Sequence, residues 1–108
     1  MRKLDVFWNG IRAGRLMEFI TGHSYLFEYT PDYVASPLPP ISVTLPKRIE
    51  PYEADSLFPF FANMLPEGAL RRVVCRECRV DEHDFFGMLT ATANVDNIGA
   101  VSCKTVTQ

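Results

Sequence analysis

The stretch from Leu57 to Gly68 spaces its apolar side chains as one face of a helix and then meets a proline. The apolar residues are Leu57, Phe60, Phe61, Met64 and Leu65. They follow the i, i+3, i+4, i+7, i+8 rule of a helix with one buried face. Asp55 or Ser56 is placed to cap this helix, and Pro59 is tolerated in a first turn whose N–H groups lack partners. Pro66 ends the helix because it lacks an N–H and clashes with the preceding turn.

The first thirty residues predict three strands. Residues 3–8 and 11–16 flank Asn9-Gly10, the pair that favours a type I′ hairpin because both positions need positive φ. Gly14 marks a possible bulge in the second strand. Residues 24–29 alternate so that Tyr25, Phe27 and Tyr29 share one face, which predicts an aromatic sheet face.

A proline-rich connection follows these strands. Residues 31–35 suit one helical turn, and the prolines that follow enforce extended backbone up to Pro40. Residues 41–45 predict a further strand, closed by Pro46. Residues 47–53 are interpreted as a loop.

Two more helices and a last strand complete the prediction. The helix over residues 69–79 is expected to turn Leu70, Val73, Val74 and Cys78 inward and Arg71, Arg72, Arg76 and Arg79 outward. The next helix begins with Asp81 as its cap, and a strand over residues 99–104 rejoins the sheet. The pattern indicates an α+β fold over residues 1–108: a small antiparallel sheet or partly open barrel with about three clustered helices.

The length and net charge of the chain limit the classes of function that it can have. A chain of 108 residues with a net charge of −2 fits one domain and argues against direct nucleic-acid binding. No apolar run approaches the roughly 20 residues that span a bilayer, and we expect no secretory signal peptide or membrane association. Three cysteines without framework spacing favour the reducing cytoplasm.

The pair Cys75 and Cys78 has the C-x-x-C spacing of zinc and redox motifs. A closed zinc site needs four ligands, and only Cys103, His23 and His83 remain as further soft or nitrogen donors. A redox pair favours a helix N-terminus, whereas this pair falls late in its predicted helix. One buried and one half-exposed thiol is the favoured interpretation, with zinc and redox roles as the alternatives.

No other cluster predicts chemistry. The arginines of the 69–79 helix have acidic neighbours and no interleaved aromatic residues, which favours a solvated face over a phosphate patch, with a salt-bridged protein contact as the main alternative. Glu82-His83-Asp84 is interpreted as a capping cluster, and Trp8 as sheet packing rather than an interface anchor. The glycines do not form a phosphate loop. We therefore predict no catalytic residue, no metal site and no cofactor.

Several segments resemble, in order, the N-terminal subdomain of the HipA family of bacterial serine/threonine kinase toxins. Residues 8–16 resemble its hairpin, residues 27–37 its "F-x-Y…WLAS" stretch, and residues 41–46 its "LSLSLPL" segment. Residues 60–68 resemble "FF-x-NLLPEG", and residues 84–89 with 99–101 resemble the closing "D-x-F-x-LL…GAV". Asn94 to Asn97 departs from the Gly-Arg-Asp usual before the final strand, which fits a chain no longer tethered to a kinase.

The resemblance implies a non-enzymatic module. The family's phosphate loop, catalytic aspartate and metal-binding motif have no counterpart in these residues. The chain is similar to the standalone HipS-like subunit of split HipBST-type toxin–antitoxin systems. This similarity implies that it binds a HipA-like kinase encoded nearby, as antitoxin, with a helix-turn-helix protein contacting DNA within the complex.

The predicted contact surface is the turn after the 57–65 helix and the arginines that follow it. Its residues are Asn63, Leu65, Pro66, Glu67, Gly68, Arg71 and Arg72. Two alternatives remain at this point: a structural subunit that assembles an active split kinase, and a degenerate fragment that binds nothing.

Overall fold

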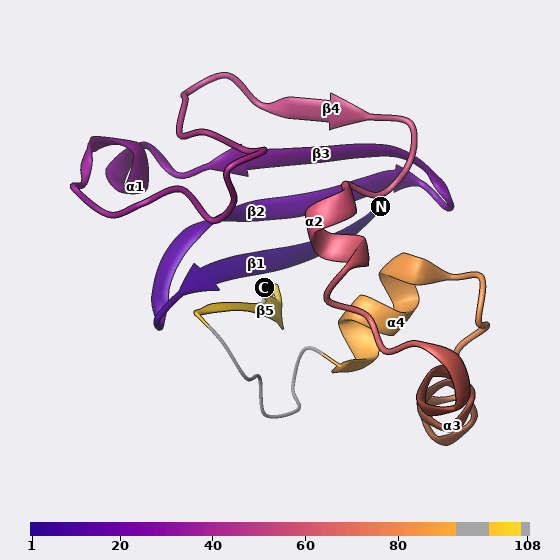
Figure 1. The fold of residues 1–108 in the computed structure, drawn as a ribbon. Coiled ribbons are helices and arrows are strands. Elements are labelled where there is room, and N and C mark those ends of the chain that lie inside the picture. Colours follow the sequence, from indigo (N-terminus) through magenta and orange to yellow (C-terminus); the bar gives the residue numbers. More distant parts are fainter. Residues whose placement is uncertain (93–99, 107–108) are drawn as a thin grey trace.

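The computed structural model describes residues 1–92 and 100–106 and contains one open antiparallel sheet (Figure 1). The strands are β1 (Arg2–Trp8), β2 (Ile11–Ile20), β3 (His23–Tyr29), β4 (Tyr52–Ala54) and β5 (Val101–Thr105). They are ordered β4-β3-β2-β1-β5. Within the described residues the helices are α1 (Pro31–Ala35), α2 (Pro59–Ala62), α3 (Gly68–Cys78) and α4 (Phe85–Thr92). The predicted α+β class is confirmed.

The first hairpin forms as its turn residues predict. Asn9 and Gly10 adopt φ angles of 47° and 82°, as a type I′ turn requires. The register shifts after Val6, because Val6 pairs with Gly14 while Phe7 pairs with Arg12. The extra residue of this bulge is therefore the one before Gly14. Gly14 itself is needed for close approach, since a Cβ there would lie 2.3 Å from the carbonyl oxygen of Glu28.

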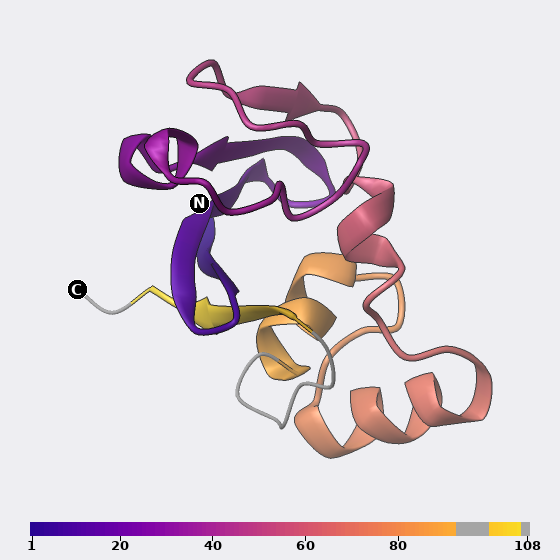
Figure 2. The ribbon, with the colours of Figure 1, turned by 60° about the vertical axis from the view of Figure 1, so that its left-hand side comes forward.

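The predicted aromatic face of β3 is confirmed and forms the centre of the core. Tyr25, Phe27 and Tyr29 are all buried. The Phe27 ring lies 5.6 Å from the Phe61 ring of α2, and the Tyr25 ring lies 6.4 Å from that of Phe86 in α4. The inner face of the sheet therefore packs directly against both helices (Figure 2).

A buried carboxylate links the sheet to the start of α4. Glu18 is 2% exposed and accepts hydrogen bonds from Arg2 Nε at 2.7 Å and from the Tyr25 hydroxyl at 2.8 Å. The two Nη atoms of Arg2 also bind Asp84, at 3.0 and 2.8 Å. The hydrogen bonds from Arg2 lower the pKa of Asp84, whereas burial and the hydrogen bond to Glu18 raise the pKa of Tyr25 to about 12.

Two elements between β3 and α2 differ from the prediction. Residues 41–45 form no strand; they make a tight turn with an isolated bridge between Ser42 and Leu45, and Val43 at its tip is 92% exposed. The Ser42 hydroxyl accepts a hydrogen bond from the Thr44 N–H, and this local bond competes with a strand. Conversely, the end of the segment predicted as a loop, residues 47–53, belongs to β4, a three-residue edge strand paired with β3.

The helix boundaries also need correction. α2 has only four residues; it begins with Pro59 at its first turn, as predicted, but its N-cap is Phe58, so neither Asp55 nor Ser56 caps it. α4 begins at Phe85 rather than after Asp81, because the Asp84 carboxylate accepts the Gly87 N–H at 3.1 Å. A short polar side chain in this position caps a helix by binding a free N–H.

β5 pairs with β1, which confirms that the last strand rejoins the sheet. Gly99, the first residue predicted for that strand, and the departure at residues 94–97 lie outside the described residues.

Candidate partner-binding surface

The turn predicted as a contact region continues from the end of α2. The Asn63 N–H donates to the Pro59 carbonyl at 2.9 Å, and the Leu65 N–H donates to the Ala62 carbonyl at 3.2 Å. Asn63 is exposed at the surface, whereas Leu65 is only 6% exposed. Leu65 therefore anchors the turn to the core and has little surface to offer a partner.

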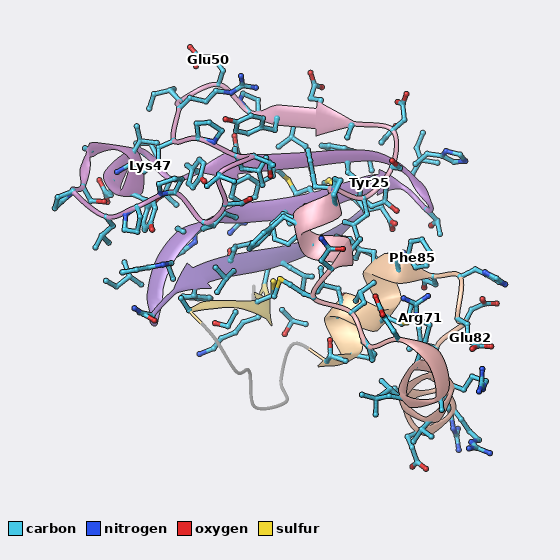
Figure 3. All side chains as sticks on the ribbon, viewed as in Figure 1. Tyr25, Lys47, Glu50, Arg71, Glu82 and Phe85 are labelled. Atoms are coloured by element: carbon cyan, nitrogen blue, oxygen red, sulfur yellow. The ribbon has the colours of Figure 1, made fainter. Side chains whose placement is uncertain are left out.

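Arg71 holds the turn in place from inside α3. Its Nε donates to the Pro66 carbonyl at 2.9 Å, and its guanidinium carbon lies 5.7 Å from the centre of the Phe85 ring. Arg71 is thus half-buried rather than outward as predicted (Figure 3). Gly68 supplies the positive φ of +59° that begins α3. Glu67 and Gly68 are exposed and Pro66 is half-buried.

α3 presents to solvent the apolar side chains that its sequence predicts to be buried. Leu70 is 61% exposed and Val73 is 43% exposed, and Cys78 is exposed as well. Cys75 is the buried residue of this helix, and Val74 is half-buried. In both ribbon views α4 lies between α3 and the sheet, so α3 reaches the body of the molecule with one narrow side (Figures 1 and 2).

The charged residues of α3 lie beside these apolar side chains. Arg72 and Arg76 are exposed, as predicted, and Arg79 follows as a left-handed C-cap with φ 57°. Among the described residues, none of these three arginines has a carboxylate oxygen within salt-bridge distance. The outer side of α3 therefore combines exposed apolar groups with arginines that form no ion pair among the described residues.

A family model described as the HipA N-terminal domain matches residues 4–104. The chain belongs to this family. A solved structure described as the N-terminal domain of HipA toxin has a TM-score of 0.73 and 32% identity, covering 100% of this chain and 95% of that one. The resemblance seen in the sequence motifs is confirmed.

Two relatives match this chain over very different shares of their own length. An uncharacterized protein of Haemophilus influenzae is 36% identical over 104 residues, which are 96% of this chain and 92% of that protein. The putative kinase Y4mE of Sinorhizobium fredii is 32% identical over 92 residues, which are 82% of this chain but only 21% of the kinase. The matched region thus makes up nearly all of one relative and about one fifth of the other.

In this HipA N-terminal domain Cys75 is buried, as favoured for one thiol of the pair, and Cys78 is exposed rather than half-exposed. Burial and nearby carboxylates raise the pKa of Cys75, and burial raises that of Cys103 to about 12. Both shifts oppose the thiolate that redox or metal chemistry requires. In residues 1–92 and 100–106 no three His, Cys, Asp or Glu side chains gather as a metal site.

Thiol labelling of the native protein tests this arrangement. We expect one thiol, Cys78, to react promptly with Ellman's reagent at pH 8, because Cys75 and Cys103 are buried as neutral thiols. Three thiols should react after unfolding in guanidinium. Cys78→Ser should remove the prompt phase, and two prompt thiols in the native protein would contradict the burial of Cys75 or of Cys103.

The remaining predicted cluster does not converge on a site. The Asp84 side chain binds Arg2, while Asp81 accepts the backbone N–H of His83 at 2.7 Å, so these two acids have structural partners. Trp8 is half-buried and packs against the core, as predicted. No helix among the described residues has the length and apolar character needed to cross a membrane.

Proposed function

We propose that this chain is a non-catalytic module, comprising residues 1–108, that binds a separately encoded HipA-like serine/threonine kinase and restrains it as an antitoxin. The observation that carries the proposal is the distribution of the domain. It forms one fifth of a putative kinase in one relative and nearly the whole of a short protein in another. A contact made within one chain in the first case becomes a contact between chains in the second.

The physical basis is the surface that such a separation exposes. A domain inside a longer chain buries part of its surface against its neighbours. The same surface in a separate protein combines an apolar centre with a polar rim. We infer that Asn63, Glu67 and Arg72 contact the kinase, while Leu65 and Arg71 hold the turn in the required shape. Pro66 and Gly68 complete the exposed bend.

We also propose that the protein acts in the cytoplasm and leaves DNA binding to another protein. The free cysteines suit the cytoplasm. The net charge of −2 makes direct contact with DNA unfavourable, so binding to DNA falls to a helix-turn-helix partner within the complex.

A second candidate function is assembly. In the putative kinase the domain belongs to the kinase chain itself. The separate domain would then complete the fold of an active kinase without inhibiting it. Both functions require binding, and they differ in the effect on growth.

Coexpression with the adjacent kinase-like reading frame tests the proposal. We expect a copurifying complex and rescue of growth, since a bound antitoxin removes kinase activity. A complex without rescue would favour assembly, and failure to copurify would contradict both functions and favour a degenerate fragment.

A matched pair of variants localises the contact. Glu67→Ala/Arg72→Ala should weaken copurification, because both side chains are exposed beside the turn. Glu50→Ala/Lys104→Ala removes the same charges from exposed positions elsewhere and should leave binding unchanged. Equal binding by both pairs would remove the turn from the contact.

A further inference from the structure

We propose that the outer face of α3 is the main docking face for the kinase, and that the kinase offers it an apolar groove bordered by carboxylates. This face consists of the exposed Leu70 and Val73 and the half-buried Val74, with Arg72 and Arg76 beside them. The inference rests on the proposed function but shifts the centre of the contact from the turn at residues 63–68 to the helix.

The exposed Leu70 and Val73 and the half-buried Val74 stand at i, i+3 and i+4, so they form one apolar stripe along the helix. This is the pattern by which a helix binds in an apolar groove. Phe85 of α4 is 40% exposed and lies beyond Arg71, which extends the apolar area past the edge of α3.

α3 is also incompletely covered in the isolated domain. Of its 11 residues only Cys75 is buried. Helices shorter than about 12–15 residues are marginal in water, and those in proteins depend on tertiary packing. The Arg71 bond to Pro66 and the buried thiol are a small share of such packing. A partner that covered Leu70 and Val73 would supply the rest.

The charged side chains of α3 indicate which groups the partner should carry. Within its own bounds the helix carries Arg71, Arg72 and Arg76 against Glu77, and the acidic residues Glu67, Asp81 and Glu82 lie just beyond its two ends. Arg72 and Arg76 have no carboxylate partner among the described residues. Guanidinium groups that have no carboxylate partner bind carboxylates well. A negative rim on the kinase groove therefore complements this helix better than a neutral one.

The test measures binding of purified variants to the kinase by biolayer interferometry. Leu70→Glu/Val73→Glu should weaken binding at least tenfold, chiefly by faster dissociation, since it places two charges in the apolar centre. Both positions are exposed and glutamate favours helices, so the fold should be kept, and circular dichroism checks this. Val43→Glu/Ile49→Glu is the matched control, because those side chains are 92% and 60% exposed and lie outside α3.

A second variant tests the carboxylate rim. Arg72→Glu/Arg76→Glu should slow association and flatten its dependence on salt, because steering between opposite charges is screened by ions. An unchanged association rate and salt dependence would exclude a negative rim.

The outcomes separate this inference from the proposed function. If the wild-type chain does not bind the kinase, both fail. If the wild-type chain binds and Leu70→Glu/Val73→Glu binds equally well, only the α3 face is excluded. The inference is also overturned if the Val43/Ile49 control weakens binding as much, or if the α3 variants change only self-association of the chain in size-exclusion chromatography.

Discussion

Phe61→Ala should lower the free energy of unfolding by about 3–5 kcal/mol, the usual range for removing a buried phenylalanine. Phe61 is fully buried, and its ring lies 5.6 Å from that of Phe27, 6.3 Å from that of Phe58 and 5.3 Å from that of Phe60. The loss includes the apolar contacts and the cavity that remains. α2 has only four residues and no side-chain cap, so it has little local stability to compensate.

Urea unfolding followed by circular dichroism measures this effect. Phe85→Ala is the matched control, since Phe85 is the same residue type at 40% exposure and should cost much less. Similar losses for the two variants would mean that α2 does not close the core as described.

Arg2→Met should be the second severe change, with a loss of about 1–3 kcal/mol, below the cost of breaking a fully buried pair because the Arg2 side chain is 35% exposed. The substitution keeps an apolar stem but leaves the Glu18 carboxylate, 2% exposed, without its cationic partner. Removing one member of a buried ion pair costs more than removing both. Arg2→Met/Glu18→Leu should therefore regain part of the lost stability. A double variant less stable than Arg2→Met would show that Tyr25 and the Gly22 N–H depend on Glu18 more than Glu18 depends on Arg2.

The cost of Arg2→Met should depend on pH. Arg2 lowers the pKa of Asp84 below its usual 3.8 in the folded protein. A carboxylate with a lowered folded pKa contributes its stability above the unfolded pKa and loses it as the pH falls through the folded value. The difference between wild type and Arg2→Met should therefore be full at pH 7 and shrink below about pH 4. A constant difference between pH 7 and pH 3 would argue against the Arg2–Asp84 pair.

The elements with strong local signals were predictable from the sequence. Asn9-Gly10 requires a hairpin because of its φ angles, and the alternation in residues 24–29 leaves one strand face aromatic. The helical turn at Pro31–Ala35 formed because proline suits a first turn. In each case neighbouring residues decide the structure, so distant contacts do not change it.

The elements that were missed depend on distant contacts. Ile41 and Leu45 are buried as alternation predicts, but Val43 between them is at a turn tip. A strand with one buried face and a tight turn with two buried ends can both have apolar residues at positions 41, 43 and 45. The pattern alone therefore does not distinguish them. β4 is three residues long and pairs only with β3, so its own sequence has little signal.

The structure of the candidate site also depends on distant contacts that the local sequence does not reveal. The periodicity of α3 marks an apolar stripe correctly, but a stripe does not say whether its own domain or another protein covers it. Cys75 faces inward and Leu70 faces solvent because α4 meets the helix on one side only. Arg71 looked like a surface charge, and its bond to the Pro66 carbonyl depends on a backbone bend that no residue pattern specifies.

The pairing of β5 with β1 has a consequence for synthesis on the ribosome. Leu4 pairs with Thr105, so the first strand to emerge waits for the last before its outer edge is filled. At about 5–20 residues per second, roughly 5–20 s pass between the two. Throughout that time the nascent chain has an open strand edge, the feature by which unfinished chains associate. The yield of folded domain should therefore depend on translation speed and chaperone supply. The stability of the finished domain should matter less for that yield.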